Sequence, residues 1–449
     1  MLHSTNYKTE DVDFKTAVLR GQALDNGLYM LNQIPKINQE IIFNFKNLEL
    51  REIAFNTLYR IIKNDIPETQ FKNIINNALN FGISIEHIQN NDNICYLSKG
   101  PTCSFKDFGA RILARILEYF LKIDDKELII LTATSGDTGG AVAQAFYEMA
   151  KIKVIVIYPK NEISELQRKQ MTTLGKNVTA IGINGKFDDC QRLVKTAFTD
   201  KDLKYIEFSS ANSINFGRLL PQIIYYFWSY SRIVEKIGEK IIFSVPSGNF
   251  GNLTGGLISY KMGLPVLHFI SAVNENDEFP RFLESGIYEK VVPSRKCISS
   301  AMNVGHPSNL ARIFDLYKGQ IDENGIIQKT PNLKEIRKDI KSYSITDELT
   351  RNTIIEFYKK FKKIIDPHGA VGWAALQNYR NTYPRNNKIK SITFETADPS
   401  KFPNEIFSLI NIKPKITSNL EIIQNKKEIS NTFDINNYQD FKLFLKNNF

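Results

Sequence analysis

Short apolar runs alternate with segments of helical periodicity through most of the chain. The runs lie at residues 128–132, 153–158, 177–183, 240–245, 266–272 and 389–394. Between them apolar side chains recur every three to four residues, as in 110–121 and 253–262, which is typical of amphipathic helices. Buried strands that alternate with helices predict an α/β fold with mostly parallel sheets and crossover helices.

The first 90 residues have a different pattern. Apolar residues at helical spacing over 49–63 and 67–79 predict two helices. We therefore expect a mainly helical N-terminal domain over residues 1–90, used for packing or for contact between subunits. The α/β region should then span 91–410 as two α/β subdomains, of which the smaller covers roughly 120–215.

Two polar segments are expected to lie outside the sheets. Residues 319–344 are rich in lysine and contain the turn signal Asn324-Gly325, which predicts a surface connection. After residue 413, lysine and asparagine alternate with isolated apolar residues. Residues 411–449 are therefore expected to form a short C-terminal appendage.

Composition narrows the class of protein. The chain has 449 residues, 42% of them hydrophobic and 24% charged, which is ordinary for a soluble globular protein. Its four cysteines (Cys95, Cys103, Cys190 and Cys297) have no CxxC spacing, so neither a disulfide framework nor a metal site is expected, and Cys103 is interpreted as a packing residue. The N-terminus has no apolar signal segment, and the most apolar stretch, 219–230, is too short to span a bilayer. A cytoplasmic protein with no membrane partner is expected.

The chain carries a net charge of +10, a feature that nucleic-acid-binding proteins share. Its lysines, however, are scattered along a sequence that is rich in lysine, asparagine and isoleucine throughout. We interpret this charge as solvated and expect no nucleic-acid partner.

Lys106 is the first sign of specific chemistry. It follows the turn Gly100-Pro101 and directly precedes the predicted helix 110–121. The positive end of a helix dipole disfavours an ammonium there, which helps to supply the neutral amine that Schiff-base chemistry needs. A lysine alone is weak support, because most lysines are solvated surface residues.

Two glycine-rich turns strengthen the signal. Residues 132–139 read TATSGDTG and residues 245–252 read VPSGNFGN, and each stretch follows a predicted strand and opens a predicted helix. Such turns present backbone N–H groups and a positive dipole end to an anion. One lysine and two anion sites at the carboxyl ends of strands are what a pyridoxal-phosphate (PLP) enzyme with an anionic substrate requires.

Seven motifs then follow in an order that resembles the threonine synthase family of fold-type II PLP enzymes. They occupy residues 16–29, 105–109, 133–139, 212–218, 299–303, 366–372 and 396–402. The resemblance covers almost the whole chain. It implies the α/β fold of the tryptophan synthase beta-like group.

The resemblance also implies a role for each matching residue. Lys106 would bind PLP as a Schiff base and move protons as a general base. Asp137 would face the phenolic oxygen of the cofactor, and the Thr396 hydroxyl would bond its pyridine nitrogen, leaving that nitrogen largely unprotonated. The cofactor phosphate would lie in the cradle formed by Gly248, Asn249, Phe250, Gly251 and Asn252. The substrate would contact Thr134, Ser135, Thr138, Asn212, Ser213 and Arg218.

The implied reaction converts O-phospho-L-homoserine and water into L-threonine and phosphate, by PLP-dependent γ-elimination and β-hydration in a monomer or homodimer. One alternative is another fold-type II PLP lyase, such as a serine/threonine dehydratase or an amino-phospholyase. The other is a non-catalytic binding protein of the same fold. The phosphate-binding motif 212–218 favours threonine synthase, because a dehydratase needs no grip on phosphate.

Some positions stay open at this point. Asp398 stands where relatives often have histidine, and Asp137 could be ionised or share a proton with the cofactor. Arg218 could instead be a solvated helix residue. His306 and His368 lie in turns without a partner at metal-ligand spacing, so both are interpreted as structural.

Overall fold

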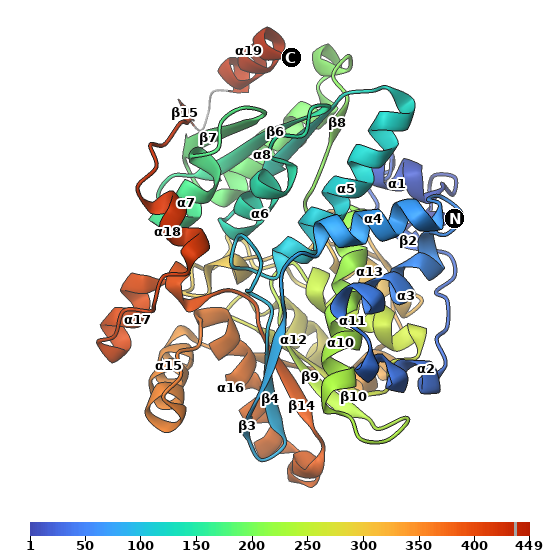
Figure 1. Cartoon of the computed structure of the whole chain (residues 1–449), viewed down its shortest axis with the longest axis vertical. Helices are drawn as coiled ribbons and strands as arrows, with labels where there is room; N and C mark the ends of the chain where they lie inside the picture. The colour runs from blue at the N-terminus through green and yellow to red at the C-terminus, as the bar shows by residue number, and fades with distance from the viewer. Residues whose placement is uncertain (435–437) are drawn as a thin grey trace.

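The computed structural model describes residues 1–434 and 438–449. Its two main sheets, of six and five strands, lie one in each lobe of the molecule (Figure 1). The larger sheet has the strand order β13-β10-β9-β14-β4-β3, and its neighbouring strands are parallel except for the β3–β4 pair. Its strands are β3 (Ser84–Gln89), β4 (Asp92–Tyr96), β9 (Ile241–Pro246), β10 (Val266–Val273), β13 (Ile340–Ser344) and β14 (Ser391–Glu395).

The smaller sheet is parallel throughout, with the order β15-β7-β6-β5-β8. Its strands are β5 (Leu128–Ala133), β6 (Ile152–Pro159), β7 (Val178–Asn184), β8 (Phe208–Ser209) and β15 (Asn431–Asp434). The predicted fold class, α/β with mostly parallel sheets, is confirmed. Each of the six apolar runs became a strand because both of its faces are covered.

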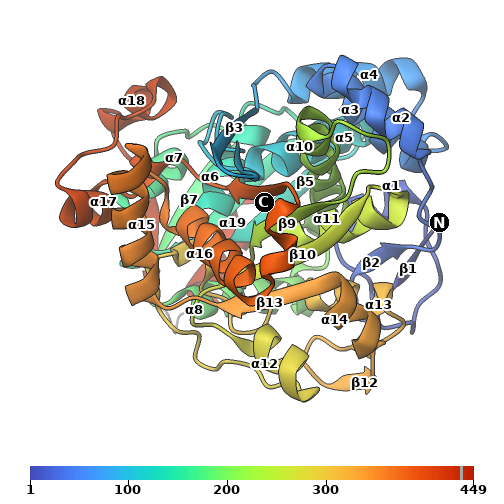
Figure 2. The ribbon, with the colours of Figure 1, turned by 90° about the horizontal axis from the view of Figure 1, so that it is seen from below.

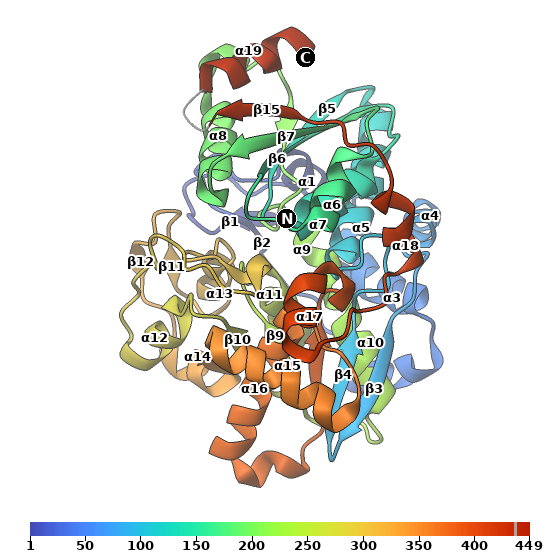
Figure 3. The same ribbon diagram turned by 90° about the vertical axis from the view of Figure 1, so that its left-hand side faces the viewer.

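Side chains of the smaller sheet alternate between two cores. Ile130 and Val154 belong to the main core with α6 (Asp137–Phe146), whereas Leu131 and Ile155 pack with α8 (Phe187–Thr199) and α19 (Tyr438–Asn448) on the opposite face. Figure 3 shows α19 above the smaller sheet. Successive residues of a strand point to opposite faces, so a strand that is covered on both faces must be apolar at every position.

The larger sheet is covered on one side by α16 (Pro367–Thr382), with α15 (Asp347–Phe361) outside it (Figure 2). Ile242 and Ile270 pack there with Val371 and Trp373. On the other face Phe243 and Phe269 join the main core. The remaining longer helices of the two lobes are α5 (Lys106–Asp124), α7 (Glu165–Thr172), α10 (Ile223–Ile233), α11 (Gly251–Met262) and α12 (Glu278–Ser285).

The N-terminal region is helical where the periodicity predicts it. The predicted helices 49–63 and 67–79 are α3 (Leu50–Ile62) and α4 (Glu68–Ala78), which pack on α10 and α5. The region also contains α1 (Phe14–Arg20), α2 (Gln39–Asn44) and the antiparallel pair β1 (Leu2–Ser4) and β2 (Tyr29–Leu31). The domain division near residue 90 stays a prediction.

Two segments differ from their predictions. Residues 319–344, predicted as a surface connection, form β11 (Gln320–Ile321), β12 (Ile327–Lys329), α14 (Leu333–Asp339) and the edge strand β13. Residues 411–449, predicted as an appendage, contribute α18 (Ser418–Gln424), strand β15 and α19, whose Phe441 and Leu445 are buried in the core of the smaller lobe. In both cases the strand lies at a sheet edge, where polar residues are tolerated.

The last short helices are α9 (Phe216–Leu219), α13 (Leu310–Leu316) and α17 (Pro403–Ile410).

Among the described residues, none of the helices has the length and apolar character needed to cross a membrane.

A buried carboxyl in α12 predicts a dependence of stability on pH. Glu278 is buried, its Oε2 has no hydrogen-bond partner among the described residues, and burial raises the pKa of its carboxyl from 4.5 to about 8. Between these two pH values the unfolded chain loses the proton while the folded chain keeps it. The free energy of unfolding should therefore fall as pH rises through this window, by up to about 1.4 kcal/mol per pH unit from this group.

The variant Glu278→Gln should lack the part of this pH dependence that comes from Glu278. The difference in free energy of unfolding between the variant and the unmodified protein, measured with urea at pH 5, 6, 7 and 8, should shift in favour of the variant as pH rises. Parallel stability profiles for the two proteins would contradict the prediction.

Candidate active site

A cavity of about 1420 Å³ lies at the carboxyl ends of β5, β9 and β14. Every site residue named from the sequence lines it: Lys106, Thr134, Ser135, Asp137, Thr138, Asn212, Ser213, Arg218, Gly248, Asn249, Phe250, Gly251, Asn252 and Thr396. The N-terminal region contributes as well, through Asn6, Arg20 and Gln22. This role adds to the packing or subunit contact expected of the N-terminal region, and Arg20 and Gln22 belong to the motif at residues 16–29.

Lys106 is the first residue of α5, as its sequence position suggested. The loop before it is held by Thr396, whose carbonyl accepts from the Phe105 N–H at 2.9 Å. The pKa of Lys106 is lowered from 10.5 to about 8, mainly by burial; Asp137 opposes this shift, and Arg218 and Lys401 contribute to it. A large share of this amine is therefore neutral near pH 8, as bond formation with a carbonyl carbon requires.

Arg218 is buried and is not the solvated residue that the sequence left open. Its Nε donates to the carbonyl of Ala211 at 3.1 Å, and its Nη1 donates to the carbonyl of Lys106. Burial lowers its pKa to about 10, so it stays cationic at neutral pH. A Cβ on Gly109 would lie 2.5 Å from Nη1 and 2.3 Å from the carbonyl oxygen of Arg218, which explains the glycine in the 105–109 motif.

The turn between β9 and α11 is shaped to receive an anion. A Cβ at Gly248 would lie 2.8 Å from Cα of Met302, so only glycine lets the two loops meet. The Tyr225 and Tyr226 hydroxyls both donate to Oδ1 of Asn252, at 2.8 and 2.9 Å, which fixes the amide. Its Nδ2 is buried and has no partner among the described residues. A free donor beside the N-terminus of α11 fits the phosphate of PLP.

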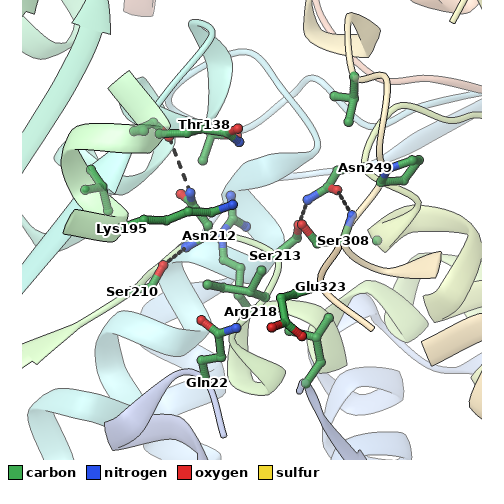
Figure 4. A pocket seen from close by; sticks show the side chains of 18 of the residues that line it. Gln22, Thr138, Lys195, Ser210, Asn212, Ser213, Arg218, Asn249, Ser308 and Glu323 are labelled. Carbon is green, nitrogen blue, oxygen red and sulfur yellow. Dashed lines mark hydrogen bonds between the residues drawn. The ribbon is translucent and has the colours of Figure 1, made fainter. Parts of the chain in front are cut away.

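Two residues of this cradle have other tasks for their side chains. Asn249 donates to Oγ of Ser213 at 2.7 Å and accepts from the Ser308 N–H at 2.6 Å, so it joins three loops (Figure 4). Phe250 has a left-handed backbone (φ 57°) and packs on Phe279 in the core. Only their backbones remain to serve the cradle.

The free Nδ2 of Asn252 predicts the behaviour of an isosteric variant. Asn252→Asp should keep the two tyrosine contacts but place a carboxylate where the phosphate binds. We expect the affinity for PLP to fall by about 10–150-fold, measured by spectroscopic titration of the apo-protein. Asn249→Asp should cause a smaller loss, because that amide nitrogen is already bonded. Equal losses would show that added charge, and not the orientation of Nδ2, decides the affinity.

The turn after β5 is organised by Thr134. Its Oγ1 accepts from the N–H groups of Gly136 (2.9 Å) and Gly139 (2.7 Å), so it caps the first turn of α6. Gly136 has φ 127°, which a side chain would disfavour. Ser135 and Thr138 line the cavity beside this helix N-terminus. Thr134 therefore shapes the site from beneath, in addition to lining it.

Residues 212–218 are supported by Arg312, which the sequence did not reveal. This fully buried side chain donates to the carbonyls of Tyr29, Ser213 and Ile214 at 2.6–3.0 Å. Ser213 Oγ accepts from the amides of Asn249 and Asn309, so its own O–H is free to donate into the cavity. Oδ1 of Asn212 is buried and has no partner among the described residues.

Asp137 forms an ion pair that the sequence also did not reveal, with Lys401 at 2.5 Å. Burial alone would raise the pKa of Asp137, but Lys401, His368 and Lys106 outweigh it and lower the pKa to about 2. The carboxylate is therefore ionised. Asp398, whose role was open, accepts from the N–H and hydroxyl of Ser400 and so caps the short turn that leads to Lys401.

Three further side chains complete the description. The hydroxyl of Thr396 has no hydrogen-bond partner in the described part of the chain and is free to meet a ring nitrogen. His368 accepts from the Ala301 N–H at 3.1 Å through Nε2, so Nδ1 carries the proton that is donated to Asp366 at 2.6 Å. His306 bonds the hydroxyl of Tyr288 at 2.7 Å. Both histidines line the cavity with their nitrogens already engaged.

Comparison with known proteins agrees with this geometry. Residues 96–392 match the family model described as pyridoxal-phosphate dependent enzyme, and residues 2–79 match the model described as threonine synthase N terminus. A threonine synthase of Buchnera aphidicola is 38% identical over 424 residues, which are 94% of each chain.

Solved structures give the same result. The structure of threonine synthase from Escherichia coli has a TM-score of 0.89 and 33% identity, with 99% of both chains covered. PLP-bound threonine synthase from Brucella melitensis has a TM-score of 0.90 and 28% identity, with 99% of this chain and 98% of that chain covered. Its cofactor is the one that the free Nδ2 of Asn252 and the glycine turn of this cavity fit. The chain belongs to the threonine synthase family of PLP-dependent enzymes.

Proposed function

We propose that this protein converts O-phospho-L-homoserine and water into L-threonine and inorganic phosphate. The observation that best supports this reaction is the combination of three features in one cavity. They are a lysine of lowered pKa, a phosphate cradle and a second anion site around Arg218. A PLP enzyme whose substrate has no phosphate would need only one such cradle. The relatives described above are threonine synthases, which agrees with this assignment.

The residues have distinct tasks in this proposal. Lys106 Nζ removes the proton from the α-carbon of the substrate and then one from the β-carbon. Arg218, with the free O–H of Ser213 and the amide of Asn212, holds the phosphate until it leaves. Ser135, Thr138 and the N-terminus of α6 receive the carboxylate. When bound, PLP supplies the electron sink for the negative charge that develops on these carbons.

The setting of the enzyme is also a proposal. We infer that it works in the cytoplasm as a monomer or homodimer, on a small-molecule substrate and without nucleic acid. The scattering of the lysines along the chain supports the part of this inference that concerns nucleic acid.

A substrate comparison tests the proposed activity. The holoenzyme is incubated separately with O-phosphohomoserine, O-phosphoserine, homoserine and threonine, and phosphate, ammonia and threonine are measured. We expect equal amounts of phosphate and threonine from O-phosphohomoserine alone. Phosphate release from O-phosphoserine, or ammonia from threonine at a comparable rate, would favour a phospholyase or a dehydratase instead.

A further inference from the structure

Lys401 is fully buried (0% exposed), and it contacts a residue of the cavity wall without lining the cavity itself. Its Nζ lies 2.5 Å from Oδ1 of Asp137 and donates to the carbonyl of Thr102 at 3.0 Å. Lys401 does not line the cavity, whereas Asp137 does. A buried ammonium is tolerated only where such partners compensate for its lost hydration. The contacts with Asp137 and Thr102 therefore account for a lysine at position 401.

The pair joins segments from both lobes at the point where Lys106 lies. Asp137 begins α6 on the smaller lobe, Thr102 belongs to the loop before α5, and Lys401 follows β14 of the larger sheet. Gln167 of α7 donates to the same Oδ1 at 3.0 Å. The direction of the carboxylate is therefore fixed from two sides, and Lys401 is the cation that contacts it directly among the described residues.

Several other titratable groups are coupled electrostatically to Asp137, Lys401 or Lys106. They are His368, which lowers the pKa of Asp137, Arg218, which lowers that of Lys106, and Asp107 and Cys103, whose pKa values Lys401 lowers against the larger effect of burial. At Lys106 burial is the main effect, and Asp137 and Lys401 act in opposite directions. Without Lys401, only burial and Arg218 would oppose the influence of the Asp137 carboxylate on Lys106, so that influence would grow.

We propose that Lys401 is a positioning residue for the cofactor site: it aims the Asp137 carboxylate and offsets its charge, and so sets the proton affinity of the nitrogen that joins Lys106 to PLP. The proposal rests on the cofactor site and not on the identity of the substrate. It concerns a lysine that acts through another side chain, because Lys401 has no surface on the cavity.

The test is a titration of the holoenzyme without substrate. The absorption of bound PLP is followed from pH 6 to 10 for the unmodified protein, Lys401→Met and the double variant Asp137→Asn/Lys401→Met. Lys390→Met is the control, because Lys390 also bonds two carboxylates (Glu235 and Glu239, at 2.7 and 3.2 Å) but lies outside the cavity lining. The midpoint reports protonation of the shared nitrogen and is independent of turnover.

We expect the midpoint of Lys401→Met to rise by about one pH unit or more, since the carboxylate then stabilises the proton alone. The double variant, which removes both charges, should show less than half of that shift, and Lys390→Met none. Bound PLP with an unchanged midpoint in Lys401→Met would overturn the proposal. If Lys401→Met fails to fold, recovery of folding and PLP binding in the double variant supports the pair, and failure of both variants overturns it.

Discussion

Replacing Lys106 by alanine is expected to lower the rate of threonine formation by about four orders of magnitude or more. The variant loses both the covalent anchor of the cofactor and the base that moves the substrate protons, and general-base catalysis alone is worth about 10²–10⁴-fold. The rate is measured as phosphate and threonine release under single-turnover conditions with saturating PLP. Lys99→Ala, a change at an exposed lysine seven residues earlier, should retain the normal rate.

Chemical trapping checks the same residue without relying on turnover. Borohydride reduction of the holoenzyme, followed by peptide mapping, should find the pyridoxyl label on Lys106. Because the neutral amine is the reactive form, the rate at which apo-protein captures PLP should rise with pH and level off above about 8, the lowered pKa of Lys106. A label on another lysine would refute the assignment.

Replacing Arg218 by glutamine should lower kcat/KM for O-phosphohomoserine by about 10–150-fold, the worth of one charge-assisted contact to phosphate. Glutamine can still donate to a neighbouring carbonyl, so the support that Arg218 gives to Lys106 is partly kept. PLP affinity should change only a few-fold, and inhibition by inorganic phosphate should weaken in parallel with kcat/KM.

The control for Arg218 is Arg20→Gln. Arg20 also lines the cavity, but it is exposed, so solvent screens its charge and only a small effect is expected. If Arg218→Gln instead loses PLP and activity to the same extent, Arg218 serves the scaffold or the cofactor and the substrate-phosphate role is wrong.

The sequence predicts most of the fold because the central strands are local signals. A run such as 128–132 is apolar on both faces, which excludes an amphipathic helix or a surface loop. Edge strands carry no such signal. Strand β13 reads IKSYS and β15 reads NTFD, and both are specified by a neighbouring strand far away in the sequence. The periodicity of a short segment does not reveal which distant strand it will pair with.

The site was predictable to a different degree. The glycine turns and the Lys106 motif are contiguous, so each could be identified from a few residues. Arg312 could not be identified in this way, and Lys401 lies in the motif 396–402 without a sign of its ion pair with Asp137. A charged side chain becomes a buried support only through partners from other segments. The glycine at 109 was visible as part of a motif, but its reason, the close approach of Arg218, is a tertiary contact.

The placement of β14 has a consequence for biosynthesis. Strand β14 lies between β4 and β9, and Lys401 bonds Thr102 across 299 positions of sequence. A nascent chain that has emerged only as far as β13 has β4 and β9 without the strand that joins them, and a Lys106 loop without its anchor. Such long sequence separation slows folding and leaves unpaired strand edges exposed meanwhile. We therefore expect the cofactor to be captured after synthesis has passed residue 401, and we expect the partly made chain to need protection by chaperones until then.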